Sequence, residues 1–165
     1  MELKIHSIGV AHTPFNDPEG MPIQPRGAKD VTGTIVLDKA YEKGLADLDG
    51  FSHIIVLFHL HRSKGYDLMV TPFLDDQKRG LFSTRAPRRP NPIGLSVVRL
   101  LGIKGNTLTI QGVDMLNKTP IIDIKPFVPL FDTNEDTGEE LRLGWLEEAQ
   151  NKASEKRSDK RFIKD

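Results

Sequence analysis

The chain of 165 residues is 38% hydrophobic and 28% charged, and it contains no cysteine. This composition is typical of one folded domain, and it excludes a disordered chain, disulfides and sites built on thiolates. No apolar run approaches the roughly 20 residues that cross a bilayer, and the first residues lack the apolar region of a signal peptide. We therefore expect a cytoplasmic protein without membrane contact.

Alternating apolar and β-branched residues predict strands over most of the chain. The predicted strands are Leu3–Val10, Val31–Leu37, Phe51–Leu60, Ile93–Ile103, Thr107–Val113 and Ile121–Ile124. Gly33 suits a β-bulge, and Gly105–Asn106 suits the turn of a hairpin between the fourth and fifth strands. The strands are mostly antiparallel in this interpretation, and closure into a barrel is the simplest way to remove their free edges.

Two segments have helical spacing. Asp38–Leu48 predicts a short helix with Asp38 as its N-cap, and Leu141–Lys156 predicts a long one. Arg62–Gly80 is a long connection, which in a compact domain is usually functional or mobile. The sequence thus predicts a mainly β fold, a small antiparallel β-barrel over residues 1–138, followed over 139–165 by a C-terminal α-helix and a charged tail.

A stiff, basic loop spans Phe82–Gly94, with the sequence FSTRAPRRPNPIG. Its prolines fix φ and hold the preceding residues extended, so its three arginines are presented from a rigid frame that suits bidentate anion binding. From Lys78 to Lys104 the chain has seven basic residues and no acidic one, although basic and acidic residues cancel at 23 each overall. Such a segment can face a carboxylate, a phosphate or a nucleic-acid backbone. A surface loop that caps the barrel, with its charges spread over different faces, is the alternative.

Histidines supply a second candidate site. His53, His59 and His61 would share a face on one regular strand, and His59-Leu60-His61 resembles the H-x-H pair of cupin metal sites. Cupins also need a Glu and a third His further along, whereas all five histidines lie at or before His61. Histidines satisfied by their neighbours are therefore favoured, and we predict no metal site.

A third candidate lies between Gly112 and Pro126. Asp114 and Asn117 bracket a turn, while Asp123 and Lys125 share one strand face. Turn formation explains the first pair and a surface salt bridge the second, so each also has a purely structural interpretation. Dinucleotide-binding, Walker A and serine-hydrolase motifs are absent from the sequence.

Together, DGFSH at 49–53, the strand end Phe58–His61, FSTRAPRRPNPIGLS at 82–96 and GVDMLNKTPIIDIKPFVP at 112–129 resemble the TrmO/TsaA-like family in order and spacing. The resemblance covers roughly residues 3 to 131. It implies a small β-barrel that binds S-adenosylmethionine and methylates N6 of threonylcarbamoyladenosine beside the anticodon of threonine tRNAs. It also implies a homodimer. A non-catalytic S-adenosylmethionine-binding regulator and a cupin-like metal enzyme are the alternatives.

The resemblance also implies roles for individual residues. The implied cofactor-binding residues are Ile23, Gln24, Pro25, His61, Arg62, Ser63, Arg88, Asp114, Met115, Leu116 and Asn117. The implied substrate-binding residues, at the anticodon loop of the tRNA, are Arg85, Arg89, Asn91 and Lys125. Arg85, Arg89 and Asp123 are the candidate catalytic residues, with Asp114 or Asp123 as the proton acceptor. The chain departs from the family pattern at Ile23, Asn117 and Phe127, where many members have arginine, aspartate and tyrosine.

Overall fold

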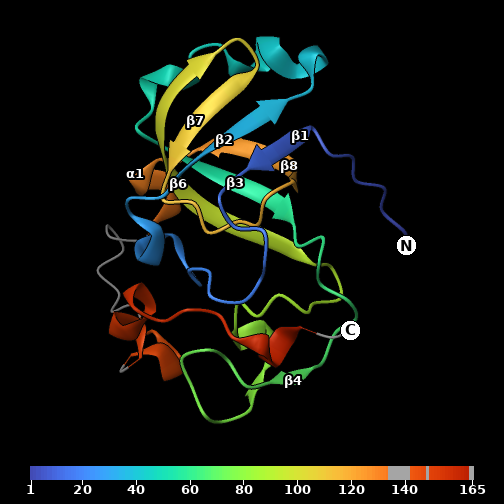
Figure 1. Cartoon of the computed structure of the whole chain (residues 1–165), viewed down its shortest axis with the longest axis vertical. Helices are drawn as coiled ribbons and strands as arrows, with labels where there is room; N and C mark the ends of the chain where they lie inside the picture. Colours follow the sequence, from blue (N-terminus) through green and yellow to red (C-terminus); the bar gives the residue numbers. More distant parts are fainter. Residues whose placement is uncertain (134–141, 148, 164–165) are drawn as a thin grey trace.

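Six strands close into an antiparallel barrel in the computed structural model, which describes residues 1–133, 142–147 and 149–163 (Figure 1). In barrel order they are β1 (Gly9–His12), β2 (Thr32–Leu37), β7 (Thr107–Gln111), β6 (Ile93–Lys104), β3 (His53–His59) and β8 (Thr119–Pro126). β1 closes the barrel by pairing with both β2 and β8. The predicted mainly β fold is confirmed.

The barrel closes around one apolar core because inward and outward residues alternate along each strand. On β3, Ile54, Val56 and Phe58 are buried, and on β7 Leu108 and Ile110 are completely enclosed. These inward side chains belong to a single hydrophobic cluster.

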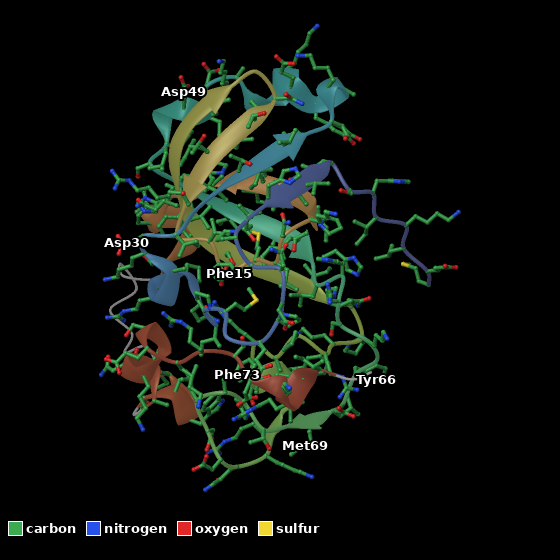
Figure 2. The ribbon with its side chains drawn as sticks, in the orientation of Figure 1. Phe15, Asp30, Asp49, Tyr66, Met69 and Phe73 are labelled. Carbon is green, nitrogen blue, oxygen red and sulfur yellow. The ribbon has the colours of Figure 1, made fainter. Side chains whose placement is uncertain are left out.

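The connections leave the barrel at two different ends. The long connections after β1, β3 and β7 are residues 13–31, 60–92 and 112–118. The antiparallel registers bring these three strand ends to the same end of the barrel, the site end. The opposite end, the capped end, is covered by the 3-10 helices η2 (Lys39–Leu45) and η3 (Leu48–Gly50). Figure 2 shows Asp49 at the capped end and Phe15 among the connections of the site end.

Below the site end, the chain forms a smaller layer (Figure 1). It contains β4 (Met69–Val70), β5 (Arg79–Gly80), η1 (Pro25–Ala28), η4 (Leu81–Ser83), η6 (Gly144–Leu146), η7 (Gln150–Ser154) and η8 (Lys160–Phe162). Its own small core consists of Val70, Leu81 and Ala86, with Phe162 packed against it. No helix among the described residues is long and apolar enough to cross a membrane.

The C-terminal segment, residues 144–147 and 149–163, is tied to the connections of the site end. The backbone N–H of Gly20 donates to the carbonyl of Ser158 at 2.8 Å, and the Trp145 indole donates to the carbonyl of Ser83 at 2.8 Å. Segments far apart in the chain therefore lie side by side in this layer.

The long helix predicted over 141–156 is wrong for the described residues of that range, which form η6 and η7. Gly144 has φ of +59°, which a right-handed α-helix does not contain. The α-helix that follows the barrel is instead α1 (Pro129–Asp132), a single turn. The predicted boundary between residues 138 and 139 lies outside the described residues.

Three smaller expectations also change. The first predicted strand begins at Gly9 rather than Leu3, because the chain of β2 turns away at Asp38 and leaves earlier residues without that neighbour. Gly33 pairs regularly and is no bulge; a Cβ there would lie 2.9 Å from the carbonyl oxygen of His12. The helix after Asp38 is a 3-10 helix without a side-chain cap.

Candidate functional site

The connections of the site end bring together most of the predicted site residues. Arg85 Nη1 donates to Gln24 Oε1 at 3.2 Å, although the two residues are 61 positions apart. Ser96 Oγ, on β6, donates to Asp114 Oδ1 at 2.6 Å. The first bond joins two of the connections to each other, and the second joins the third connection to the barrel wall.

Asp114 is fixed by the turn that follows β7. Gly112 has φ of +85°, a conformation that favours glycine, and its N–H donates to the carbonyl of Val31 at 2.9 Å. Burial raises the pKa of the Asp114 carboxyl to about 6, while the Ser96 hydrogen bond and the positive charge of Arg85 act in the opposite sense. Near neutral pH this carboxyl can therefore give up or take a proton.

Asn117 connects the same turn to the connection after β1. Its Oδ1 accepts from the N–H of Thr13 at 3.3 Å, and its Nδ2 donates to Asn16 Oδ1 at 2.9 Å. Thr13 Oγ1 donates to the carbonyl of Met115 at 2.8 Å. The Met115 side chain is buried in the barrel core, so only its backbone lies toward the site.

The segment after β3 is held against the stiff, basic loop Phe82–Gly94. Ser63 Oγ donates to the carbonyl of Pro87 at 3.0 Å. Arg88 is buried, donates through Nε to the carbonyl of Lys64 at 3.0 Å, and forms an ion pair with Asp67. The predicted cofactor-binding residues His61–Ser63 and Arg88 are therefore neighbours, and Arg88 fastens the two loops together.

His61 lies just beyond β3. Its Nδ1 is 3.5 Å from Thr119 Oγ1, and burial, with the nearby charge of Arg62, holds its pKa below the ordinary value. The lowered pKa favours the neutral form of the imidazole. His53 and His59 are exposed on the outer face of β3, and in the described part of the chain no group of three His, Asp or Glu side chains could hold a metal ion.

Arg85 and Arg89 have different surroundings, although both come from the same rigid loop. The Arg85 side chain is exposed, near Gln24 and Asp114. Arg89 Nη1 instead donates to the carbonyls of Thr84 and Ala86 at 2.9 and 3.3 Å, so its guanidinium braces the loop from inside. Asn91 is exposed at the end of that loop.

Asp123 and Lys125 do not join the site. They lie farther along β8, where their side chains form an ion pair at 2.6 Å. Asp123 lines a hollow near the capped end together with Ile8 and Tyr41. Its ion pair with Lys125 and its place in this hollow argue against a catalytic role at the site end.

Sequence reasoning does not identify Ser96 or Thr13 as site residues. Ser96 carries a detectable signal, because it shares the inward parity of Val98 and Leu100 on β6, and a polar residue at such a position needs a partner. Thr13 has no such signal in the sequence, because threonine is a common residue at the end of a strand.

The combined residues suit a ligand that carries both charges and apolar surface. The carboxyl of Asp114 can accept from hydroxyl or ammonium groups, and Arg85 can donate to a carboxylate. Ile23 and Leu116 are partly buried and supply apolar surface. The Asp114 carboxyl and this apolar surface fit S-adenosylmethionine, which has an ammonium, ribose hydroxyls and an apolar base.

Comparison with known proteins gives relatives of the same size and of larger size. A probable S-adenosyl-L-methionine-binding protein from Pyrococcus abyssi is 49% identical over 94% of this chain and 83% of its own length. Human tRNA (adenine(37)-N6)-methyltransferase is 32% identical over 81% of this chain, which spans only 32% of that protein. The crystal structure of TrmO from Pseudomonas aeruginosa is 34% identical with a TM-score of 0.72, over 88% of this chain and 63% of that one.

The family assignment rests on the barrel and the connections of the site end. The model of the tRNA-methyltransferase O N-terminal domain matches residues 10–133, from β1 to the residue after α1. That range contains the six barrel strands, except Gly9 at the start of β1, and the residues Gln24, Arg85, Ser96 and Asp114. The resemblance seen in the sequence motifs is therefore confirmed, and the chain belongs to the tRNA-methyltransferase O family.

Proposed function

We propose that the protein is an S-adenosylmethionine-dependent tRNA methyltransferase that acts on N6 of threonylcarbamoyladenosine beside the anticodon. The observation that carries the proposal is the Asp114 carboxyl, with its pKa of about 6, held among the family motifs at the site end. The names of the human and Pseudomonas relatives support the reaction class. The names of the archaeal relatives support the cofactor.

S-adenosylmethionine, when bound, supplies an electrophilic methyl group. In this proposal Ile23–Pro25, His61–Ser63 and Asp114–Asn117 hold it, because all three segments belong to connections of the site end. Asn117 keeps an amide oxygen where many family members have a carboxylate. The side chains of Arg88 and Met115 contribute indirectly, by fixing the loop and filling the core.

The acceptor nitrogen is conjugated to a carbonyl, so it is a weak nucleophile and its proton must leave as the new N–C bond forms. Asp114 accepts this proton, because it is the carboxyl that lies in the site with a pKa close to neutrality. Arg85, exposed beside it, binds the threonyl carboxylate of the modified base. Alignment supplies the rest of the rate enhancement, since the displacement needs no covalent intermediate.

Transfer of a labelled methyl group tests the proposed function. The purified protein should methylate tRNA that carries threonylcarbamoyladenosine but not tRNA that lacks it, and a chelator should not change the rate. Mass spectrometry of the nucleosides should locate the methyl group on N6. Cofactor binding without transfer to any tRNA would favour a non-catalytic S-adenosylmethionine-binding regulator instead.

A homodimer in the cytoplasm completes the proposal. The net charge is zero with histidine neutral, so self-repulsion does not oppose association. Light scattering should give the mass of two chains at working concentration. The mass of one chain at full activity would contradict this part of the proposal alone.

A further inference from the structure

Phe82 is an exposed aromatic side chain on a rigid support. It lies in η4 and is 77% exposed, whereas its neighbour Leu81 is 1% exposed and belongs to the small core of the lower layer. Large apolar side chains are usually buried, and a phenylalanine held out into water costs the fold stability that it could otherwise gain.

Hydrogen bonds fix the backbone on both sides of Phe82. Leu81 N–H donates to the carbonyl of Leu68 at 2.9 Å, and Thr84 N–H donates to the carbonyl of Leu81 at 3.0 Å. Ser83 Oγ donates to the carbonyl of Gly80 at 2.8 Å, and the Ser83 carbonyl accepts from the Trp145 indole. The ring is therefore presented by an ordered loop, and little entropy remains to be lost on binding.

Basic side chains lie at the Phe82 ring and near it in the chain. The Arg89 guanidinium carbon lies 5.9 Å from the ring centroid, held there by its bonds to loop carbonyls. Arg85, three residues along, and Lys78 are exposed, and the chain has no acidic residue from Lys78 to Lys104. A flat apolar ring inside a basic surface matches an unpaired nucleobase flanked by phosphates, because every base has a π-face and every nucleotide a negative charge.

From this placement we propose that Phe82 is a base-stacking residue, which binds an unpaired nucleotide of the RNA loop next to the nucleotide at the site. The inference rests on the proposed function and adds to it a contact that positions the substrate. A second copy of this chain is the competing occupant of such an exposed ring. The basic side chains near Phe82 disfavour it, because two copies would bring like charges together.

The test compares Phe82→Ala, Phe82→Tyr and Phe131→Ala, using a fluorescent anticodon stem–loop RNA that carries threonylcarbamoyladenosine. Phe131 lies in α1 and is 79% exposed, so it is a control matched in residue type and exposure. Phe82→Ala should raise the Kd for this RNA by about 5- to 150-fold, the range of one lost base stack. Phe82→Tyr, which keeps the ring, and Phe131→Ala should each stay within about twofold of the wild type.

The salt dependence of Kd and the mass in light scattering distinguish stacking on a base from an electrostatic contact and from association with a second copy. The slope of log Kd against log salt should be the same for Phe82→Ala and wild type, because stacking releases no counterions. Cofactor affinity and the mass in light scattering should also be unchanged. An unaltered Kd in Phe82→Ala, a reduced salt slope, or a change of mass would each overturn the stacking role. Wild-type protein that neither binds nor methylates this RNA would overturn the proposed function as well.

Discussion

At the capped end of the barrel the connections are short or well covered, whereas at the site end they are long and polar. β6 and β7 are joined by residues 105–106 alone, and the connection from β2 to β3 packs Leu45 into the core. The hollow of about 580 Å³ near this end is lined mostly by apolar side chains. The site end instead receives connections of many residues, whose side chains form hydrogen bonds to one another and to the barrel wall.

The large apolar hollow and the residues that can carry out chemistry therefore lie at opposite ends of the barrel. A large apolar hollow is the default location of a binding site in a protein of unknown function. Here the titratable carboxyl of Asp114 and the guanidinium of Arg85 lie at the other end, on loops that the barrel positions. Substitutions at the two ends should therefore differ in kind: those at the capped end should leave methyl transfer unchanged, and those at the site end can change it.

Replacement of the two carboxylates gives the largest contrast. Asp114→Asn should lower kcat by at least about 100-fold, the contribution of a positioned general base. Asp123→Asn should change kcat by less than about twofold, since Asp123 lies near the capped end and bonds to Lys125. Methyl transfer to modified tRNA measures both. Equal losses in the two variants would remove the functional distinction between the ends.

The pH dependence of the wild type follows from the raised pKa of Asp114. Below pH 6 the carboxyl holds a proton and cannot accept another, so kcat should rise with pH through about 6 and then level off. Stability should change in the opposite direction, because the folded state binds the proton more tightly than the unfolded one and loses this advantage between about pH 4 and 6. Rate profiles and melting curves across that range check both signs.

Lysine substitutions should distinguish two arginines within the site end. Arg85→Lys keeps the charge but loses the planar fork, and we expect kcat/KM to fall by about 5- to 150-fold at an unchanged Tm. Arg89→Lys should instead lower Tm by about 4–8 °C, because a lysine cannot bridge the same loop carbonyls. Kinetics and melting are measured on the same preparations. A stable Arg89→Lys enzyme with the larger kinetic loss would reverse these roles.

Ser96→Ala should have a smaller effect, on the pH dependence of the rate. The Ser96 hydrogen bond favours the charged form of Asp114, so its removal should raise the pKa of Asp114 further. The rising limb of the rate profile should move to higher pH, while the rate at high pH stays near that of the wild type. A limb that does not move would show that another group controls the profile.

The smallest expected effect lies at the capped end. Asp47, between η2 and η3, has φ of +64°, which glycine adopts at lower cost. Asp47→Gly should raise Tm by about 1–2 °C and leave methyl transfer unchanged. A loss of activity in this stable variant would show that changes at the capped end do affect catalysis at the site end.

Most of the barrel is predictable from the sequence because its strands follow local rules. Alternation identifies β3, β6 and β7, and Gly105–Asn106 identifies the turn between the last two. The segment around 141–156 shows where such rules fail. Its apolar residues are spaced as in a helix, but Trp145 bonds to Ser83 and Gly144 has a positive φ, so tertiary contacts replace the helical ones.

The site is predictable in its segments and not in its internal contacts. The motifs identify Gln24, Arg85 and Asp114, yet the Arg85–Gln24 bond joins residues 61 positions apart. No pattern of neighbouring residues in the sequence predicts a contact between two residues so far apart. The same holds for Arg89, whose role within the loop depends on which carbonyls point inward, and this is a property of the folded backbone alone.

The anchoring of the first long connection has a consequence for biosynthesis. Ser158 Oγ accepts from the N–H of Met21 at 3.1 Å across 137 positions, and β1 closes the barrel only by pairing with β8. A ribosome makes the chain from its N-terminus, so Gln24 emerges long before the residues that fix its loop. The nascent chain thus exposes β1 without its later partner and cannot acquire the cofactor site strand by strand. We expect affinity for S-adenosylmethionine to arise in one late step, when Ser158 docks.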